Sequence, residues 1–261
     1  MTGVQTCALP IWGLAGETWS FMAMTAKLGG ETWFNLGDRD LATHIARTRR
    51  LRAGESLSAI TTSLCERLGI AARIVPMSDD PVRTIVVTDT GDLSFQHYFV
   101  RLKCEPVLKA LRFEGAATAR PAAGLLAALD DAALGGIVIC PSNPYLSVQP
   151  ILEVPGIRER LAARRVPLVA VSPIVGGRAI KGPAAKILRE LGHEPSALAV
   201  ARHYAGLIDA LVLDEADAAL APAVEALGMR AVVTDTIMRD APSARALAQT
   251  SLDAVARLRA R

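Results

Sequence analysis

The chain has 261 residues, 51% of them hydrophobic, and a formal net charge of +3. It can bury one large core or two smaller ones, and it lacks the charge footprint of a nucleic-acid-binding protein and any apolar run of membrane-spanning length. The four cysteines, Cys7, Cys65, Cys104 and Cys140, have neither zinc-site nor disulfide-framework spacing, which favours a cytoplasmic protein.

Residues 1–11 (MTGVQTCALPI) do not have the pattern of a native N-terminus. They contain no basic segment, and their apolar stretch is too short for a signal peptide. They resemble the translation of a sequencing adaptor at the end of a metagenomic contig. We therefore expect native sequence from Trp12 onward, a single domain over residues 12–261, and a true N-terminus that is missing.

Helical patterns dominate the next part of the chain. Apolar spacing predicts a helix over 17–28 that ends at a pair of glycines, and then a short strand over 32–36. Residues 37–40 open a further helix, with Asp38 or Asp40 as its N-cap. We expect its apolar face to include Leu41, Ile45, Thr48 and Leu51, and its arginines to lie in solvent. Ser56 is expected to cap the helix that follows.

Over residues 72–115 the sequence pattern changes from helical to strand-like, which predicts a β-rich insertion. Strands are predicted at 73–75, 84–88, 93–102 and 107–113, with a hairpin turn at 89–92. This pattern predicts an antiparallel unit beside or over a parallel sheet. An alanine-rich helix over 121–134 leads out of it.

From residue 136 onward, strands and helices alternate. Strands are predicted at 136–140, 167–172, 208–213 and 230–234, and helices at 184–191, 196–204, 215–227 and 241–257, the last capped by Asp240. The first two strands are continuous apolar runs, typical of fully buried parallel strands. The alternation predicts an α/β fold with a doubly wound, mostly parallel sheet.

Polar loops follow the first two of these strands, where open α/β sheets bind ligands. In Pro141-Ser142-Asn143-Pro144, the serine and the asparagine suit a base edge or a phosphate. The same four residues also suit a rigid turn in which the asparagine caps the backbone. The spacing does not decide between these interpretations.

The second loop, SPIVGGRAIKGP, combines glycines with basic side chains. Ser172, Gly176, Gly177 and Lys181 could bring backbone amides and a cation to a phosphate. The loop is neither a Walker A sequence nor a dinucleotide fingerprint, and a flexible loop with solvated charges is the alternative.

Two further clusters of polar residues lie earlier in the chain. Asn35, Asp38 and Arg39 could orient a ring or a hydroxyl group, or else supply caps and an internal ion pair. Asp79 and Asp80 could touch a metal, although we favour a turn and a cap. Near the C-terminus, Asp235 follows a predicted strand and could face the same cleft as the loops or cap its own turn.

Five segments of the chain carry a family resemblance: LGDRDLATHIARTRRLRAGESLS, PMSDDPVRT, ICPSNPYLSVQPILEVPGIRERL, VAVSPIVGGRAIKGPAAKIL and VVTDTIM. Together they resemble the 2-phospho-L-lactate transferase family of coenzyme F420 biosynthesis, over almost everything from Trp12 onward. The resemblance implies a Rossmann-like α/β domain with a smaller inserted subdomain. It also implies magnesium-dependent transfer of a phospholactyl or phosphoenolpyruvyl group from a guanylyl diphosphate donor to the deazaflavin Fo. GMP would leave, F420-0 or dehydro-F420-0 would form, and the protein would tend to be a homodimer.

The same resemblance implies roles for individual residues. Ser142, Asn143 and the loop from Ser172 to Lys181, with Gly176 and Gly177, would flank the guanosine diphosphate part of the donor. Asn35, Asp38 and Arg39 would flank the deazaflavin.

Family members begin with a glycine-rich phosphate loop and an acidic segment that have no counterpart here. We therefore expect the first βα unit, with the catalytic and metal-binding residues, to be missing, and the chain by itself to be inactive. The alternative is a non-catalytic, nucleotide-sugar-binding regulator of the related gluconeogenesis-factor family. That family shares the fold and a PSNP-like turn, but its later loop differs.

Overall fold

The structure, a computed structural model, describes residues 16–260, so the expectation about residues 1–11 lies outside the described residues. Its centre is a four-stranded parallel sheet in the order β4-β5-β8-β9. These strands are β4 (Ile137–Ile139), β5 (Leu168–Val171), β8 (Ala210–Asp214) and β9 (Arg230–Thr234). All four correspond to strands predicted from the alternating pattern, which confirms the α/β fold class.

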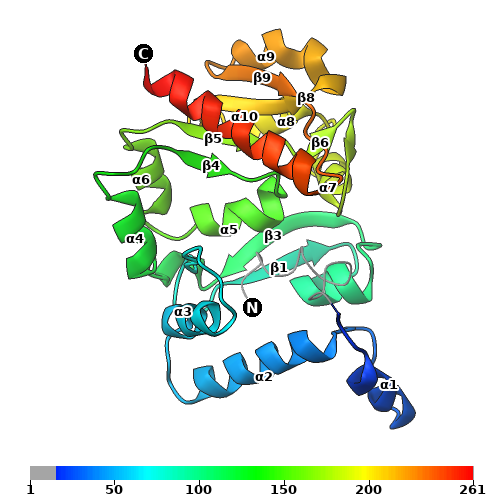
Figure 1. Cartoon of the computed structure of the whole chain (residues 1–261). Coiled ribbons are helices and arrows are strands. Elements are labelled where there is room, and N and C mark those ends of the chain that lie inside the picture. The colour runs from blue at the N-terminus through cyan, green and yellow to red at the C-terminus, as the bar shows by residue number, and fades with distance from the viewer. Residues whose placement is uncertain (1–15, 261) are drawn as a thin grey trace.

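Helices cover both faces of this sheet (Figure 1). One face carries α5 (Gln149–Leu152), α6 (Ile157–Ala162), α7 (Ala184–Glu190), α8 (Ala197–His203) and α9 (Ala221–Glu225). The other face carries α10 (Ala241–Arg259), which crosses in front of the strands in Figure 1. Successive side chains of a strand point to opposite faces of the sheet. Leu168 and Leu211 accordingly lie in one core cluster, while Val169 and Val212 lie in the cluster under α10. The doubly wound arrangement is therefore confirmed.

The strands are not equally buried. β5 and β8 are buried along their whole length, but β4 is half-buried throughout. The expectation of a fully buried strand at residues 136–140 is wrong because β4 pairs with β5 on one side and with no described strand on the other.

A three-stranded antiparallel sheet precedes the parallel sheet, as predicted for the β-rich insertion. Its strands are β1 (Arg83–Thr88), β2 (Gly91–Ser94) and β3 (Leu108–Glu114), in the order β2-β1-β3. The hairpin between β1 and β2 turns at residues 89–90, where it was predicted. The strand expected at residues 73–75 is not found there.

Residues 95–101 are helical rather than extended, which corrects most of the strand predicted at 93–102. They contain the π-helical turn η2 (His97–Arg101). Phe95 and Tyr98 are both buried in one apolar cluster. A helix places residues three apart on one face, whereas a strand would point them to opposite sides, so burial of this pair favours the helix.

Three helices form the N-terminal part of the described chain: α1 (Ser20–Lys27), α2 (Asp38–Arg52) and α3 (Leu57–Arg67). The strand predicted at 32–36 is absent, because no described strand pairs with it, and Trp33 instead packs edge-on against His97. On α2 the expected faces are partly reversed, with Ile45 58% exposed and Arg47 only 7% exposed. Ser56 caps α3 through the backbone N–H of Ala59, as predicted.

The remaining elements connect these parts. They are η3 (Ala116–Thr118), α4 (Ala123–Leu129), η4 (Pro144–Val148), β6 (Ile174–Val175), β7 (Arg178–Ala179) and η5 (Glu215–Leu220). The single helix predicted at 215–227 is divided into η5 and α9, since Pro222 lacks the N–H that a continuous α-helix would need there. Asp240 caps α10 as predicted. No helix within residues 16–260 is long and apolar enough to cross a membrane.

Candidate functional site

The two polar loops lie side by side at the carboxyl edge of the parallel sheet. β4 and β5 are parallel neighbours, with Ile139 opposite Ala170, so both strands end at the same edge. Ser142 and Asn143 follow β4, and Ser172 follows β5. The structure therefore brings together the loops that the sequence analysis selected, in the place where parallel α/β sheets bind ligands.

Asn143 has a fixed orientation within its turn. Its Oδ1 accepts hydrogen bonds from the backbone N–H groups of Tyr145 at 3.0 Å and Leu146 at 3.1 Å. The capping interpretation is therefore correct for the oxygen of this amide. Its Nδ2, however, is buried and has no hydrogen-bond partner within the described residues. A buried donor without a partner is costly, so a ligand or another partner from outside the described residues would stabilise this group.

Part of the second loop forms a short hairpin of β6 and β7. Ser172 is buried, and its Oγ accepts from the N–H of Ile174 at 3.1 Å while donating to the carbonyl of the same residue at 3.0 Å. Gly176 and Gly177 form the two-residue turn between β6 and β7, with φ of 54° and 75°, a region that favours glycine.

Gly176 at the turn and Lys181 beyond the hairpin are both candidates for phosphate binding. The N–H of Gly176 donates to Asp217 Oδ2 at 3.0 Å, so this amide already has a protein partner. Lys181 is exposed just beyond β7. Phosphate binding by the loop stays a prediction.

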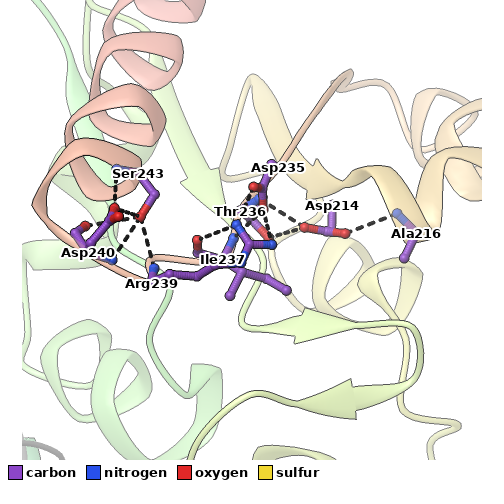
Figure 2. A network of polar contacts seen from close by, with 8 residues as sticks. All are labelled: Asp214, Ala216, Asp235, Thr236, Ile237, Arg239, Asp240 and Ser243. Atoms are coloured by element: carbon purple, nitrogen blue, oxygen red, sulfur yellow. Dashed lines mark hydrogen bonds and ion pairs between the residues drawn. The ribbon is translucent and has the colours of Figure 1, made fainter.

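Figure 2 shows a polar network where β8 and β9 end at the same edge. Asp214 Oδ2 accepts from both the N–H and the hydroxyl of Thr236 at 2.9 Å, and its Oδ1 accepts from Ala216 N at 3.0 Å. Burial raises the pKa of Asp214, but these hydrogen bonds outweigh it and hold the pKa below its ordinary value. The network thus ties the end of β8 to the end of β9 with an ionised carboxylate.

Asp235 has a turn-forming role in the same view. Its Oδ1 accepts from Ile237 N at 3.0 Å, and its Oδ2 lies 2.5 Å from Arg239 Nη1, which lowers the pKa of the Asp235 carboxyl group. Of the two interpretations left open, the structure shows the turn. Asp214 and Asp217 were not among the predicted site residues. An aspartate that ends an apolar strand just before a helical run is a recognisable N-cap signal, which Asp214 carries and Asp217, inside η5, does not.

The residues expected near an acceptor are placed by reciprocal capping of α1 and α2. Asp38 accepts from Thr18 Oγ1, Ser20 N and Phe21 N, while Glu17 accepts from the N–H groups of Arg39 and Asp40. These hydrogen bonds lower the pKa of both carboxyl groups. The expectation that Asp38 or Asp40 caps α2 is wrong, because Asp38 caps α1 and Glu17 serves α2.

Asn35 and Arg39 are exposed on this N-terminal part. In Figure 1, α1 and α2 lie below the three-stranded sheet, apart from the parallel sheet and its loops. The described residues thus supply two separate candidate regions, one at the carboxyl edge and one around the start of α2. Contact of Asn35, Asp38 and Arg39 with an acceptor stays a prediction.

Metal binding receives little support from the described residues. Asp79 accepts from Ser58 N in the first turn of α3 at 2.6 Å, which agrees with the cap role that we favoured, and Asp80 accepts from Arg120 N at 2.8 Å. Residues 16–260 contain no group of three or more histidine, cysteine, aspartate or glutamate residues placed to hold a metal. We therefore assign no magnesium ligand among the described residues.

A cavity of about 520 Å³ lies beside the turn that contains Asn143. Its walls include Tyr145, Ser196, Arg202, His203 and Leu220. The ring of His203 lies 4.6 Å from that of Tyr145, and its Nε2 is buried with no hydrogen-bond partner among the described residues. Burial, with Arg158 and His193 nearby, lowers the pKa of His203 to about 4. Nothing in the residues next to His203 in the sequence signals this burial.

These features define a Rossmann-like α/β protein with a polar, turn-built carboxyl edge, the place where such sheets bind ligands. The fold is similar to that of a UPF0052-family protein from Bacillus halodurans, with a TM-score of 0.53, 15% identity, and coverage of 79% of this chain and 70% of that one. At this identity the likeness concerns the fold alone.

Sequence comparison identifies the family. The profile of 2-phospho-L-lactate transferase CofD matches residues 19–251. A phosphoenolpyruvate transferase of Streptomyces griseus is 44% identical over 255 residues, which cover 95% of this chain and 80% of that protein. A 2-phospho-L-lactate transferase of Methanosarcina acetivorans is 40% identical, with coverage of 91% and 76%. The chain belongs to the CofD family of transferases of coenzyme F420 biosynthesis.

Proposed function

We propose that this protein transfers a phospholactyl or phosphoenolpyruvyl group from a guanylyl diphosphate donor to the deazaflavin Fo, with release of GMP. The observation that carries the proposal is the buried Nδ2 of Asn143, a donor held without a partner at the carboxyl edge of the sheet. The family match and the relatives named as transferases support a catalyst rather than a regulator. Both acids are included because relatives named for each of them are similar to this chain.

The reaction would be a phosphoryl transfer between two oxygens. A hydroxyl oxygen of the acceptor would form a bond to the distal phosphorus of the donor, the bond from that phosphorus to the GMP oxygen would break, and the hydroxyl proton would pass to solvent. Such reactions depend mainly on positioning and on charge stabilisation. Asn143 would bind the guanosine half, Lys181 would neutralise phosphate charge, and Arg39 would orient the acceptor ring.

Magnesium and the assembly belong to the same proposal. Magnesium commonly binds through substrate phosphates and one or two carboxylates, and it would neutralise charge on the diphosphate. We assign no described residue as its ligand. The homodimer expected from the family resemblance would be measured by sedimentation.

The experiment compares two substitutions of Asn143. Asn143→Asp keeps an oxygen to accept from Tyr145 and Leu146, but it replaces the Nδ2 donor with a charged acceptor. We expect it to weaken GDP binding by about 1–3 kcal/mol, and to lower the melting temperature as well, because the new charged oxygen takes a buried position without a donor. Asn143→Ala should weaken GDP binding and also lower the melting temperature, because the cap is lost as well.

Titration calorimetry with GDP and magnesium chloride gives the affinities, and release of GMP in the presence of Fo and donor gives the activity. GDP binding by Asn143→Asp that equals the wild type would remove Asn143 from the nucleotide site. Binding of a nucleotide sugar by the wild-type chain in preference to GDP would contradict the transferase proposal.

A further inference from the structure

We propose that Lys186 is a positioning residue for the donor nucleotide, because it ties the three-stranded sheet to the helix that follows the second loop. This inference rests on the proposed function, since it takes the loops after β4 and β5 as the nucleotide site. It gives the β-rich insertion a role in positioning the nucleotide site, whereas the reaction proposed above involves no residue of the insertion.

Lys186 lies on α7, which begins three residues after Lys181. Its Nζ donates to the carbonyl of Pro106 at 2.9 Å and to the Tyr98 hydroxyl at 3.4 Å, and it forms an ion pair with Glu190 one turn along the same helix. The other Glu190 oxygen, Oε2, accepts from Leu108 N at 3.1 Å. The two charged side chains of α7 thus bind backbone groups of Pro106, just before β3, and of Leu108, its first residue.

The polar contacts sit against an apolar cluster that reaches both loops. The cluster contains Val86, Phe95, Tyr98, Cys104, Leu108, Leu146 and Ile187. Leu146 belongs to η4, directly after Asn143, and Ile187 belongs to α7, directly after Lys186. The insertion therefore packs at once against the segment that follows the first loop and the segment that follows the second.

The backbone at this junction is unusual. Tyr98 lies in the π-helical turn η2, and Lys103 and Cys104 follow with φ of 48° and 60°. Positive φ in residues other than glycine costs free energy and persists where surrounding contacts hold it. Burial raises the pKa of Cys104 to about 11 and also raises the pKa of Tyr98, so both stay neutral near pH 7. Glu190 is then the anionic partner of Lys186 in this set.

The ion pair is largely removed from solvent, with side chains 32% and 13% exposed for Lys186 and Glu190. Removal of the lysine would leave the Glu190 carboxylate half-paired and the Pro106 carbonyl without this donor. The start of β3 would then be free to shift against α7, and the separation of the two loops would no longer be held. Small displacements of binding groups have large effects on how a bound group is oriented.

The test compares Lys186→Met with a matched substitution at a distant ion pair. Arg164 pairs with Asp209, which also accepts from Leu168 N at the opposite, amino end of β5, and the arginine side chain is 11% exposed. Lys186→Met and Arg164→Met each remove one cation from a partly buried pair. We expect both to lower the melting temperature, but only Lys186→Met to weaken GDP binding, by about tenfold.

Glu190→Gln is the milder variant, since it keeps an acceptor for Leu108 N and removes the charge that holds Lys186. We expect it to weaken GDP binding less than Lys186→Met, and its result decides the proposal if Lys186→Met does not fold. Calorimetry with GDP and magnesium chloride measures all variants.

The outcomes separate the two proposals. If the wild type does not bind GDP, the proposed function fails. If the wild type binds GDP and the Lys186 and Glu190 variants bind it equally well despite lower melting temperatures, Lys186 is a structural residue and the inference is overturned. Equal weakening by Arg164→Met would also overturn it, because the effect would then follow stability rather than position.

Discussion

At the residue scale, His203 shows how burial alone sets a protonation state. Its ring packs between those of Tyr145 and Tyr204, at centroid distances of 4.6 and 5.0 Å. Burial lowers its pKa to about 4 from the ordinary 6.5, so the folded protein holds a neutral ring near pH 7. The unfolded chain binds a proton at a higher pH than the folded chain does. Stability is therefore complete above about pH 6.5 and falls as the pH drops toward 4.

We predict that His203→Phe reduces this pH dependence. Phenylalanine keeps a ring between the two tyrosines and cannot take up a proton. Between pH 7.5 and pH 5, the wild type should lose about 2 kcal/mol of unfolding free energy through this residue, and the variant should not. Denaturant titrations of both proteins at the two pH values measure the difference. The same pH-dependent loss in the variant would show that His203 is not the group responsible.

At the element scale, the contact between α10 and the start of β4 depends on a missing side chain. A Cβ at Gly136 would lie 2.2 Å from Cγ1 of Val255 on α10 and 3.3 Å from the carbonyl oxygen of Pro167. Val255 is buried in the cluster that α10 forms with β5 and β8. Glycine at position 136 therefore allows α10, the longest helix of the described chain, to pack closely against the sheet.

We predict that Gly136→Ala destabilises the protein by about 1–3 kcal/mol through overpacking. The double variant with Val255→Ala should recover part of that loss, because it removes the methyl groups that the new Cβ would meet. Thermal or denaturant unfolding of the two single variants and the double variant gives the coupling between the sites. Simple additivity of the two losses would contradict a direct clash between these positions.

At the scale of the whole molecule, the two sheets share packing rather than standing apart. Leu146 follows the first loop of the parallel sheet, yet it is buried in the cluster of the insertion with Val86 and Tyr98. Tyr145, its neighbour, packs against both that cluster and the main core. The insertion and the parallel sheet should therefore unfold together.

We predict that Leu146→Ala lowers the stability of both sheets by the same amount, about 2–5 kcal/mol for a buried leucine. Hydrogen exchange in increasing denaturant can follow the amides of β1 and β5 separately. Equal losses in the two strands would confirm one cooperative unit. A loss confined to β1, with β5 unchanged, would show that the insertion opens by itself.

Local patterns were enough to predict much of this protein. The four parallel strands, the antiparallel insertion with its turn at residues 89–90, and the caps Ser56 and Asp240 follow from apolar periodicity and from side chains that bond their own backbone. The order of the strands also placed the two loops at one edge, because parallel strands end together. The family was recognisable from five ordered motifs.

Tertiary structure decided what depends on partners distant in sequence. Residues 95–101 became helical because Phe95 and Tyr98 share one core, and Asp38 caps α1 because the chain returns to meet it. The Lys186 contacts join α7 to residues about 80 positions earlier, and the buried Nδ2 of Asn143 is visible only once its turn is formed. Periodicity reports which side of an element faces the core, whereas pairing, burial and protonation depend on which elements meet there. A single sequence does not contain that information in any local form.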